Sequence, residues 1–118
     1  MGNKVVHFEV IGKDGKKLQD FYAGLFGWKI DASNPMGYGI VDAGDAGIGG
    51  GVASGMDGGA GHLTFYVEVE DLAAALKKAE GLGGKTTMPP MAVPDGPEIA
   101  MFSDPEGHLV GLVKAGSG

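Results

Sequence analysis

The chain has 118 residues, enough for one domain with a core and too few for two independent domains. It contains no cysteine, which excludes disulfides, thiolate metal sites and cysteine nucleophiles. Its net charge of −6 argues against a nucleic-acid partner, and no apolar run approaches the roughly 18–20 residues that cross a bilayer. The N-terminus passes directly into a strand pattern without the apolar segment of a signal peptide, so we expect a cytoplasmic protein with no membrane partner.

Residues 4–54 are predicted to form a first module of a strand, a helix and three more strands. The first strand, Lys4–Ile11, alternates and places His7 and Glu9 on one face. Asp14 is the predicted N-cap of the helix, whose apolar stripe is expected to face the sheet and whose end is Gly27. The stripe consists of Leu18, Phe21, Tyr22, Leu25 and Phe26, and the remaining strands are Trp28–Ser33, Tyr38–Asp42 and Ile48–Ser54.

Residues 62–115 repeat this order after a glycine-rich loop, Gly55–Gly61. His62–Val69 is the predicted strand and Asp71 the N-cap of the second helix. Lys85–Met88 is a strand that Pro89 and Pro90 are expected to stop, because proline cannot donate to a ladder. The last two strands are Glu98–Ser103 and His108–Lys114, joined by the turn Asp104–Gly107.

The two modules are related in sequence as well as in pattern. When the chain is shifted along itself so that Phe8 falls on Phe65, Asp14 falls on Asp71 and Gly27 on Gly84. Such a repeat indicates two copies of one supersecondary unit, each too small to bury its own apolar face. Residues 1–118 are therefore one predicted domain, with function expected where the copies meet.

These landmarks resemble the vicinal oxygen chelate superfamily, which includes glyoxalase I, bleomycin resistance proteins and extradiol dioxygenases. The resemblance is carried by Phe21-Tyr22 with Leu25-Phe26-Gly27-Trp28, by Val69-Glu70-Asp71-Leu72, and by Phe102-Ser103-Asp104-Pro105-Glu106-Gly107-His108. It implies an α+β fold in which two tandem βαβββ modules form a curved mixed sheet with an internal cleft. It also implies a homodimer.

The enzymes of this superfamily hold a divalent ion in the cleft, and the resemblance assigns its ligand positions. His7 fills the first-strand position, but its counterpart in the second module is Thr64. His62 lies two residues earlier on the same strand face, and a register slip would be needed for it to replace Thr64. Gly111 stands where the last strand should supply a carboxylate, and Ile48–Ser54 contains no ligand. We therefore expect no cofactor, with His7 and His62 as the metal ligands if a metal is bound at all.

Other polar and apolar residues are candidates for binding an organic molecule rather than a metal. Glu9 and Glu98 are strand carboxylates that could face inward, and His108 is expected to lie exposed in its turn. Gly49-Gly50-Gly51 lacks the lysine, hydroxyl and helix of a phosphate loop, so it is expected to be a bulge or a place where a ligand lies against backbone. The predicted ligand-binding residues are His7, Glu9, Trp28, Tyr38, His62, Thr64 and Met101, and no catalytic residue is assigned.

These observations favour a protein that binds a small organic molecule in the inter-module cleft without metal, like the drug-sequestering bleomycin resistance branch associated with antibiotic resistance. The acidic balance suits a cationic or amphipathic ligand. The alternative is an enzyme, a metal-dependent glyoxalase-like lyase or isomerase or an extradiol-type ring-cleaving dioxygenase. A third possibility is a structural or regulatory domain with a filled cleft.

Overall fold

The structure is a computed structural model that describes residues 2–42, 44, 47–55 and 61–117. Within them, two helices and eight strands follow the predicted order. Residues 56–60, in the loop predicted to separate the modules, lie outside the described residues. The elements are β1 (Val5–Gly12), α1 (Gly15–Phe26), β2 (Ile30–Asp31), β3 (Gly39–Val41), β4 (Gly49–Ser54), β5 (His62–Val69), α2 (Leu72–Gly81), β6 (Lys85–Ala92), β7 (Glu98–Ser103) and β8 (Leu109–Lys114).

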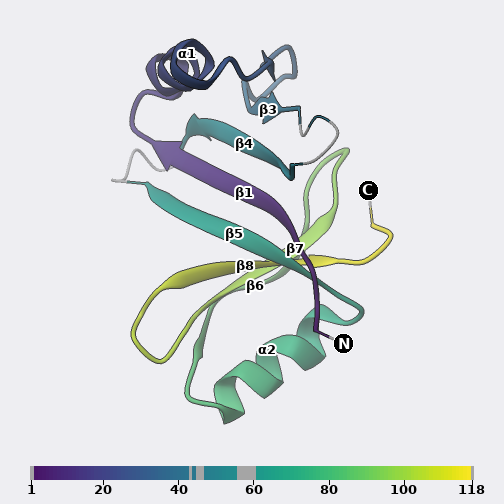
Figure 1. Cartoon of the computed structure of the whole chain (residues 1–118). Helices are drawn as coiled ribbons and strands as arrows, with labels where there is room; N and C mark the ends of the chain where they lie inside the picture. The colour runs from purple at the N-terminus through teal and green to yellow at the C-terminus, as the bar shows by residue number, and fades with distance from the viewer. Residues whose placement is uncertain (1, 43, 45–46, 56–60, 118) are drawn as a thin grey trace. The chain divides into compact units, whose positions relative to one another are not determined.

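The chain divides into two compact units, each with one helix and a four-stranded arrangement. The first unit is residues 7–64 and the second is residues 1–6 with residues 65–118. The strand order is β2-β3-β4-β1 in the first and β5-β8-β7-β6 in the second. β1 pairs in parallel with β4 and β5 with β8, while the other pairs within each unit are antiparallel. The predicted α+β class, with two βαβββ modules and mixed strand pairing, is confirmed (Figure 1).

Both helices begin at their predicted N-caps, and α1 ends at its predicted glycine. The carboxylate of Asp14 accepts from the backbone N–H of Lys17, and that of Asp71 accepts from the backbone N–H of Ala74. Gly27 follows α1 in the left-handed conformation, with φ 71°, which glycine adopts without steric cost. In the second unit α2 packs along β6, β7 and β8, burying Leu72 and Leu76 against Ala100 and Leu112 (Figure 1).

The buried face of α1 differs from the prediction. Its buried residues are Gly15 and Gln19, whereas Phe21, Leu25 and Phe26 of the predicted stripe are all more than half exposed. The reason is the close approach of the helix to β4. The Gln19 side chain donates to the carbonyl oxygens of Val52 and Gly37, and a Cβ on Gly15 would lie 2.5 Å from the backbone nitrogen of Ser54.

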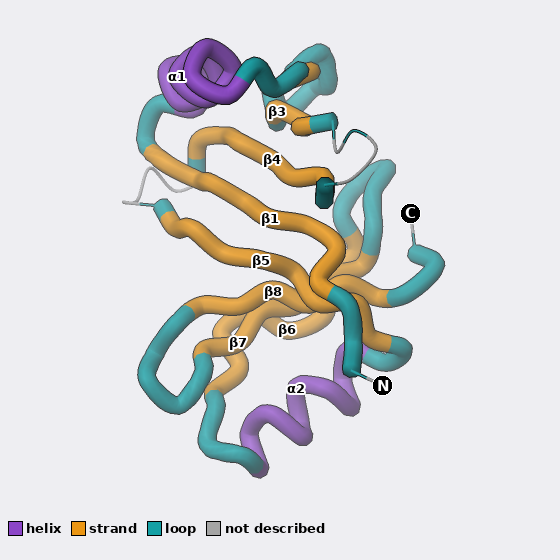
Figure 2. Tube along the Cα trace, viewed as in Figure 1, coloured by secondary structure: helices purple, strands orange, loops and turns teal. Residues whose placement is uncertain are grey.

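Three strands also depart from their predicted form. β2 contains only Ile30–Asp31, so most of the segment after α1 is loop, which Figure 2 shows in teal. β6 continues through Pro89 and Pro90 to Ala92, because its register shifts there and because it is an edge strand where a missing N–H is tolerated. The glycine run in β4 is not a bulge, since β1 and β4 pair without interruption from His7 and Gly49 to Gly12 and Ser54. Among the described residues, no helix is long and apolar enough to cross a membrane.

The contact between α1 and β4 can be tested with two glycines of the same helix. Gly15→Ala should lower the free energy of unfolding by about 1–3 kcal/mol, because the new Cβ meets the backbone of Ala53 and Ser54. Gly24→Ala meets nothing within 4 Å and should raise stability by about 0.5–1 kcal/mol through helix propensity. Urea denaturation of both variants measures these changes, and equal stability of the two would refute the described packing of α1.

Candidate functional site

Four polar side chains of the first unit meet on the face of its strands that lies away from α1. His7 and Glu9 alternate along β1, and His62 begins β5. Tyr38 precedes β3 and is held by Asn34, whose side-chain oxygen accepts from the Tyr38 backbone N–H at 2.9 Å while its amide donates to the Tyr38 carbonyl at 2.6 Å. The turn between them places the Tyr38 ring over the strands.

The Glu9 carboxylate is the centre of this cluster. Its Oε2 accepts a hydrogen bond from the Tyr38 hydroxyl at 3.0 Å, and its Oε1 lies 2.8 Å from Nε2 of His62. Nε2 of His7 lies 2.9 Å from the same Tyr38 hydroxyl. Because that hydroxyl gives its proton to Glu9, His7 must be the donor to the hydroxyl oxygen. Tyr38 and His62 thus direct protons toward one partly buried carboxylate, and His7 directs a proton toward the Tyr38 hydroxyl.

Gly51 makes room for the Tyr38 ring. Gly51 pairs with Glu9 across β1 and β4, so the two residues share a face. A Cβ at position 51 would lie 1.7 Å from the Tyr38 hydroxyl oxygen. The neighbouring Gly50 serves the opposite face in the same way, because a Cβ there would meet the ring of Phe8 at 2.3 Å. The glycine run therefore accommodates aromatic rings of the protein itself.

The same pairing recurs in the second unit with different residues. Gly111 of β8 pairs with Tyr66 of β5, and a Cβ on Gly111 would lie 2.4 Å from the Tyr66 ring. Gly111 is the position where the resemblance expects a metal-binding carboxylate. A glutamate there would have to displace the buried ring of Tyr66, so the local packing does not accommodate the missing ligand.

The donor atoms of the two predicted metal-binding histidines are already engaged within the protein. Nε2 of His7 faces the Tyr38 hydroxyl, and Nε2 of His62 faces Glu9. Across the described ranges, no three His, Asp or Glu side chains are grouped so that they could hold a metal ion. The residues that the structure describes thus do not fit a divalent ion, for which three protein ligands are usual.

The electrostatics favour a neutral His7. Burial lowers the pKa of the His7 imidazole below its ordinary value of 6.5, although the charge of Glu9 acts in the opposite direction. At neutral pH His7 is therefore an uncharged donor to Tyr38, and the negative charge of Glu9 is balanced mainly through its hydrogen bonds.

Of the other predicted ligand-binding residues, Trp28 lies on the opposite face of the sheet and Met101 lies in the second unit. Trp28 packs on the α1 side of the sheet, with ring centroids 5.2 Å from Phe8 and 5.8 Å from Tyr22. Thr64 is half-buried in β5, and Met101 is buried in β7 opposite Gly111. The sequence did not predict that Asn34 holds Tyr38 or that Gly51 makes room for the Tyr38 ring. The Asn-Pro turn and the glycine run were local signals for these two roles.

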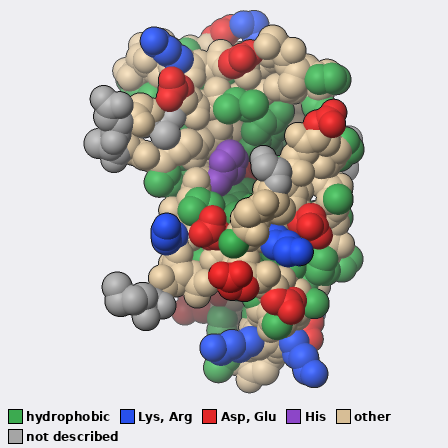
Figure 3. All heavy atoms as spheres, turned by 90° about the vertical axis from the view of Figure 1, so that its right-hand side faces the viewer, with side chains coloured by type: hydrophobic (Ala, Val, Ile, Leu, Met, Phe, Trp, Pro, Cys, Tyr) green, Lys and Arg blue, Asp and Glu red, His purple; other side chains and the backbone are tan. Residues whose placement is uncertain are grey.

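Two further polar residues considered from the sequence contact polar partners at the surface. Glu98 is about half exposed and lies 3.7 Å from the Lys114 ammonium. His108 is exposed and lies 2.9 Å from the carboxylate of Asp104, whose pKa is lowered chiefly by the backbone N–H of His108. On the face drawn in Figure 3, acidic and lysine side chains are interspersed rather than gathered by sign. Exposed pairs of this kind contribute little to stability.

Comparison with known proteins identifies the family. The model of the Glyoxalase/Bleomycin resistance protein/Dioxygenase superfamily matches residues 4–112. The chain belongs to this superfamily. It is 31% identical over 91 residues to mycobacterial proteins named "Putative glyoxylase CFP32", from Mycobacterium bovis and Mycobacterium tuberculosis. The match covers 77% of this chain and 35% of those proteins, so the chain spans about a third of the length of these curated relatives.

Several solved structures share the fold. Hypothetical protein BH1468 from Bacillus halodurans superposes with a TM-score of 0.70 at 16% identity, covering 100% of this chain and 98% of its own. Methylmalonyl-CoA epimerase from Mycobacterium tuberculosis gives 0.63 at 15% identity, covering 93% and 86%. The Mn(II)-bound glyoxalase from Novosphingobium aromaticivorans gives 0.64 at 18% identity, covering 95% and 38%. At these identities the similarity shows the fold and no more.

The lowered pKa of His7 predicts a pH-dependent loss of stability. The unfolded chain takes up a proton near pH 6.5 while the folded chain resists it, so the free energy of unfolding should fall as the pH drops through 6.5 and level off below the folded pKa. His7→Gln keeps a donor for Tyr38 but does not titrate. Thermal melts between pH 7.5 and 5.0 should therefore show a larger decrease in Tm for the parent than for the variant. Parallel decreases would contradict the burial of a neutral His7.

Proposed function

We propose that the first unit binds a small organic molecule on the face that carries Glu9, Tyr38, His7 and His62, and that binding requires no metal. The observation that supports this most directly is the hydrogen-bond cluster on Glu9. A carboxylate held by two donors in a half-buried position is preorganised to fix the orientation of a polar ligand group. Glycine at positions 51 and 111, and threonine at position 64, are consistent with binding that does not depend on an ion.

Metal-free binding of this kind corresponds to the drug-sequestering branch of the superfamily. Sequestration needs affinity and no reacting group, which agrees with a site whose polar atoms are satisfied by one another. Tyr38 supplies a flat ring beside the carboxylate, so a ligand with a planar apolar part and a polar group is the kind that fits.

A second candidate is an enzyme, a metal-dependent lyase or isomerase or a ring-cleaving dioxygenase. It is favoured by the 31% identity to proteins named as a glyoxylase. It would require His7 and His62 to be released from their present partners. It would also require further metal ligands from other positions, because Gly51 and Gly111 have no side chain to supply.

The two candidates differ in whether the rise in Tm caused by a ligand depends on a metal that EDTA removes. We expect an organic ligand found by a thermal-shift screen to raise Tm equally with and without EDTA. At a ligand concentration of about 100 Kd the stabilisation is about 2.7 kcal/mol. Glu9→Gln should abolish the shift, whereas Glu98→Gln, which alters an exposed strand carboxylate of the second unit, should retain it.

Three results would count against metal-free binding. The first is a shift that needs added Zn²⁺, Ni²⁺, Mn²⁺ or Fe²⁺ and disappears with EDTA, because it favours the enzyme. The second is full retention of the shift in Glu9→Gln, which would move the site away from this cluster. The third is the absence of any stabilising compound from a screen that includes organic cations, anions and neutral aromatic molecules.

We also propose that two copies of the chain associate through α1. Phe21, Leu25 and Phe26 are 58%, 60% and 55% exposed, and no charged residue lies between Phe21 and Trp28. A contiguous apolar patch of this kind is typical of an interface, and a two-fold axis would pair it with itself.

Light scattering should give about twice the chain mass of 11.9 kDa at tens of micromolar. Leu25→Lys should shift the protein toward the monomer by placing two like charges at the axis. Leu82→Lys, at an even more exposed leucine that follows α2, should not. A monomeric parent would refute the dimer, and a dimeric Leu25→Lys would refute this surface.

A further inference from the structure

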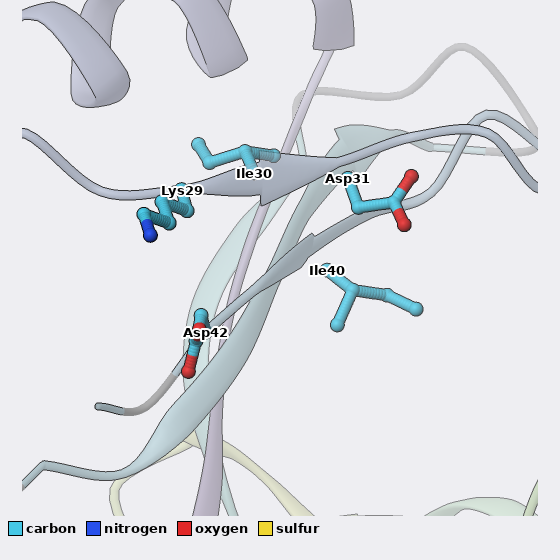
Figure 4. A pocket seen from close by; sticks show the side chains of 5 residues that line it. All are labelled: Lys29, Ile30, Asp31, Ile40 and Asp42. Atoms are coloured by element: carbon cyan, nitrogen blue, oxygen red, sulfur yellow. The ribbon is translucent and has the colours of Figure 1, made fainter. Parts of the chain in front are cut away.

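A hollow of about 360 Å³ lies at the edge of the first unit, beside β2 and β3. Lys29, Ile30, Asp31, Ile40 and Asp42 line it. In the close-up of Figure 4, Ile30 points toward the helix, while Lys29, Ile40 and Asp42 lie on the opposite side of the strands. The volume is at the lower end of the range for small-molecule sites.

The hollow lies on the same face as the Glu9 cluster, as strand register shows. Asp31 pairs with Ile40, Ile40 with Gly51, and Gly51 with Glu9. Directly paired residues point to the same side of a sheet, so these four positions form one row across the unit. With neighbouring strands about 4.8 Å apart, the row extends about 14 Å from Glu9 to Asp31.

Within this row the position on β4 carries no side chain. Gly51 is the β4 member, and the Tyr38 ring lies over it. Ile40, the β3 member, is 53% exposed. The surface between Glu9 and the hollow is therefore the flat ring of Tyr38 followed by an exposed aliphatic side chain, which suits an apolar ligand body.

The charges on this face are mostly negative. Glu9, Asp31 and Asp42 are carboxylates, and Lys29 is the ammonium opposite Asp42, where the Asp42 backbone N–H donates to the Lys29 carbonyl. The Ser33 hydroxyl and backbone N–H donate to Asp31 and lower the pKa of its carboxyl, so Asp31 stays ionised at neutral pH. His7 is neutral on the same face.

We infer that the ligand of the proposed site is an elongated organic cation, whose charged end lies in the hollow between Asp31 and Asp42 and whose apolar body crosses Ile40 and the Tyr38 ring toward Glu9. This inference rests on the proposed function and adds the charge and shape of the ligand. Two carboxylates that flank an exposed isoleucine bind a cation with an apolar body better than an anion of the same size, because the anion meets repulsion from both.

The test compares two fluorescent probes of similar size, the cation thioflavin T and the anion 1-anilinonaphthalene-8-sulfonate, titrated at low ionic strength. The parent should bind the cation at least tenfold more tightly than the anion. Asp31→Asn and Asp42→Asn should each weaken cation binding about two- to fivefold, because an exposed charge pair contributes modestly. Both variants retain a side-chain oxygen for the present hydrogen bonds of Asp31 and Asp42.

The matched control is Asp20→Asn, which removes one exposed carboxylate from α1 on the other side of the unit. It should leave the affinity for thioflavin T unchanged, and added salt should weaken binding in the parent more than in the Asp31→Asn/Asp42→Asn double variant. Glu9→Gln should also weaken binding, because the far end of the cation lies there.

Each outcome supports or overturns a definite statement. If the aspartate variants and Glu9→Gln all weaken thioflavin T binding, the extended cation site is supported. Weakening by Glu9→Gln alone, or equal affinity for the two probes, overturns the inference and leaves the proposed function standing. Weakening by the aspartate variants alone contradicts the proposed function, since the Glu9 cluster would then not be part of the site. Absence of thioflavin T binding overturns the inference, while the thermal-shift screen tests the proposed function separately.

Discussion

The site depends on two hydrogen bonds that converge on the carboxylate of Glu9. A carboxylate as little exposed as this one is costly to desolvate unless both oxygens find donors, and Tyr38 and His62 supply them. The donors come from segments far apart in the chain, so satisfying Glu9 also fixes the position of the Tyr38 ring and of the start of β5. Removing one partner would leave a charge underpaired, a larger loss than one neutral hydrogen bond.

Glycine is what allows this arrangement. Gly51 lets the Tyr38 hydroxyl reach Glu9, and Gly111 lets the Tyr66 ring lie at the paired position of the second unit. The two units thus share one packing feature: a glycine on the last strand of each module makes room for a tyrosine ring. In the first unit the ring joins a polar cluster, and in the second it is buried. Gly111 is also the position where the superfamily resemblance would place a carboxylate, so the Tyr66 ring and a metal-binding carboxylate exclude each other there sterically.

Those parts of the fold that depend on short-range chemistry could be predicted from the sequence. Asp14 and Asp71 begin the helices and Gly27 ends α1 through bonds to residues within four positions of them, and the order of the elements along the chain followed from the repeat. The buried face of α1 could not be predicted, because Gln19 finds its partner at Val52 and the periodicity of the apolar residues points elsewhere. Likewise, alternation placed His7 and Glu9 on one face, but the contact between Glu9 and His62 spans 53 positions and depends on tertiary structure. The glycine run was ambiguous because a missing side chain does not say what fills the space.

The central claim is that Tyr38 donates to Glu9 while His7 and His62 direct Nε2–H groups toward the same cluster. Long-range proton–nitrogen correlation spectra of ¹⁵N-labelled protein at pH 7.5 report the tautomer of each imidazole. The account predicts that both His7 and His62 carry a proton on Nε2, and that the signals of both change in Glu9→Gln. A His7 protonated on Nδ1 alone would mean that Tyr38 donates to His7 instead, and would contradict the account.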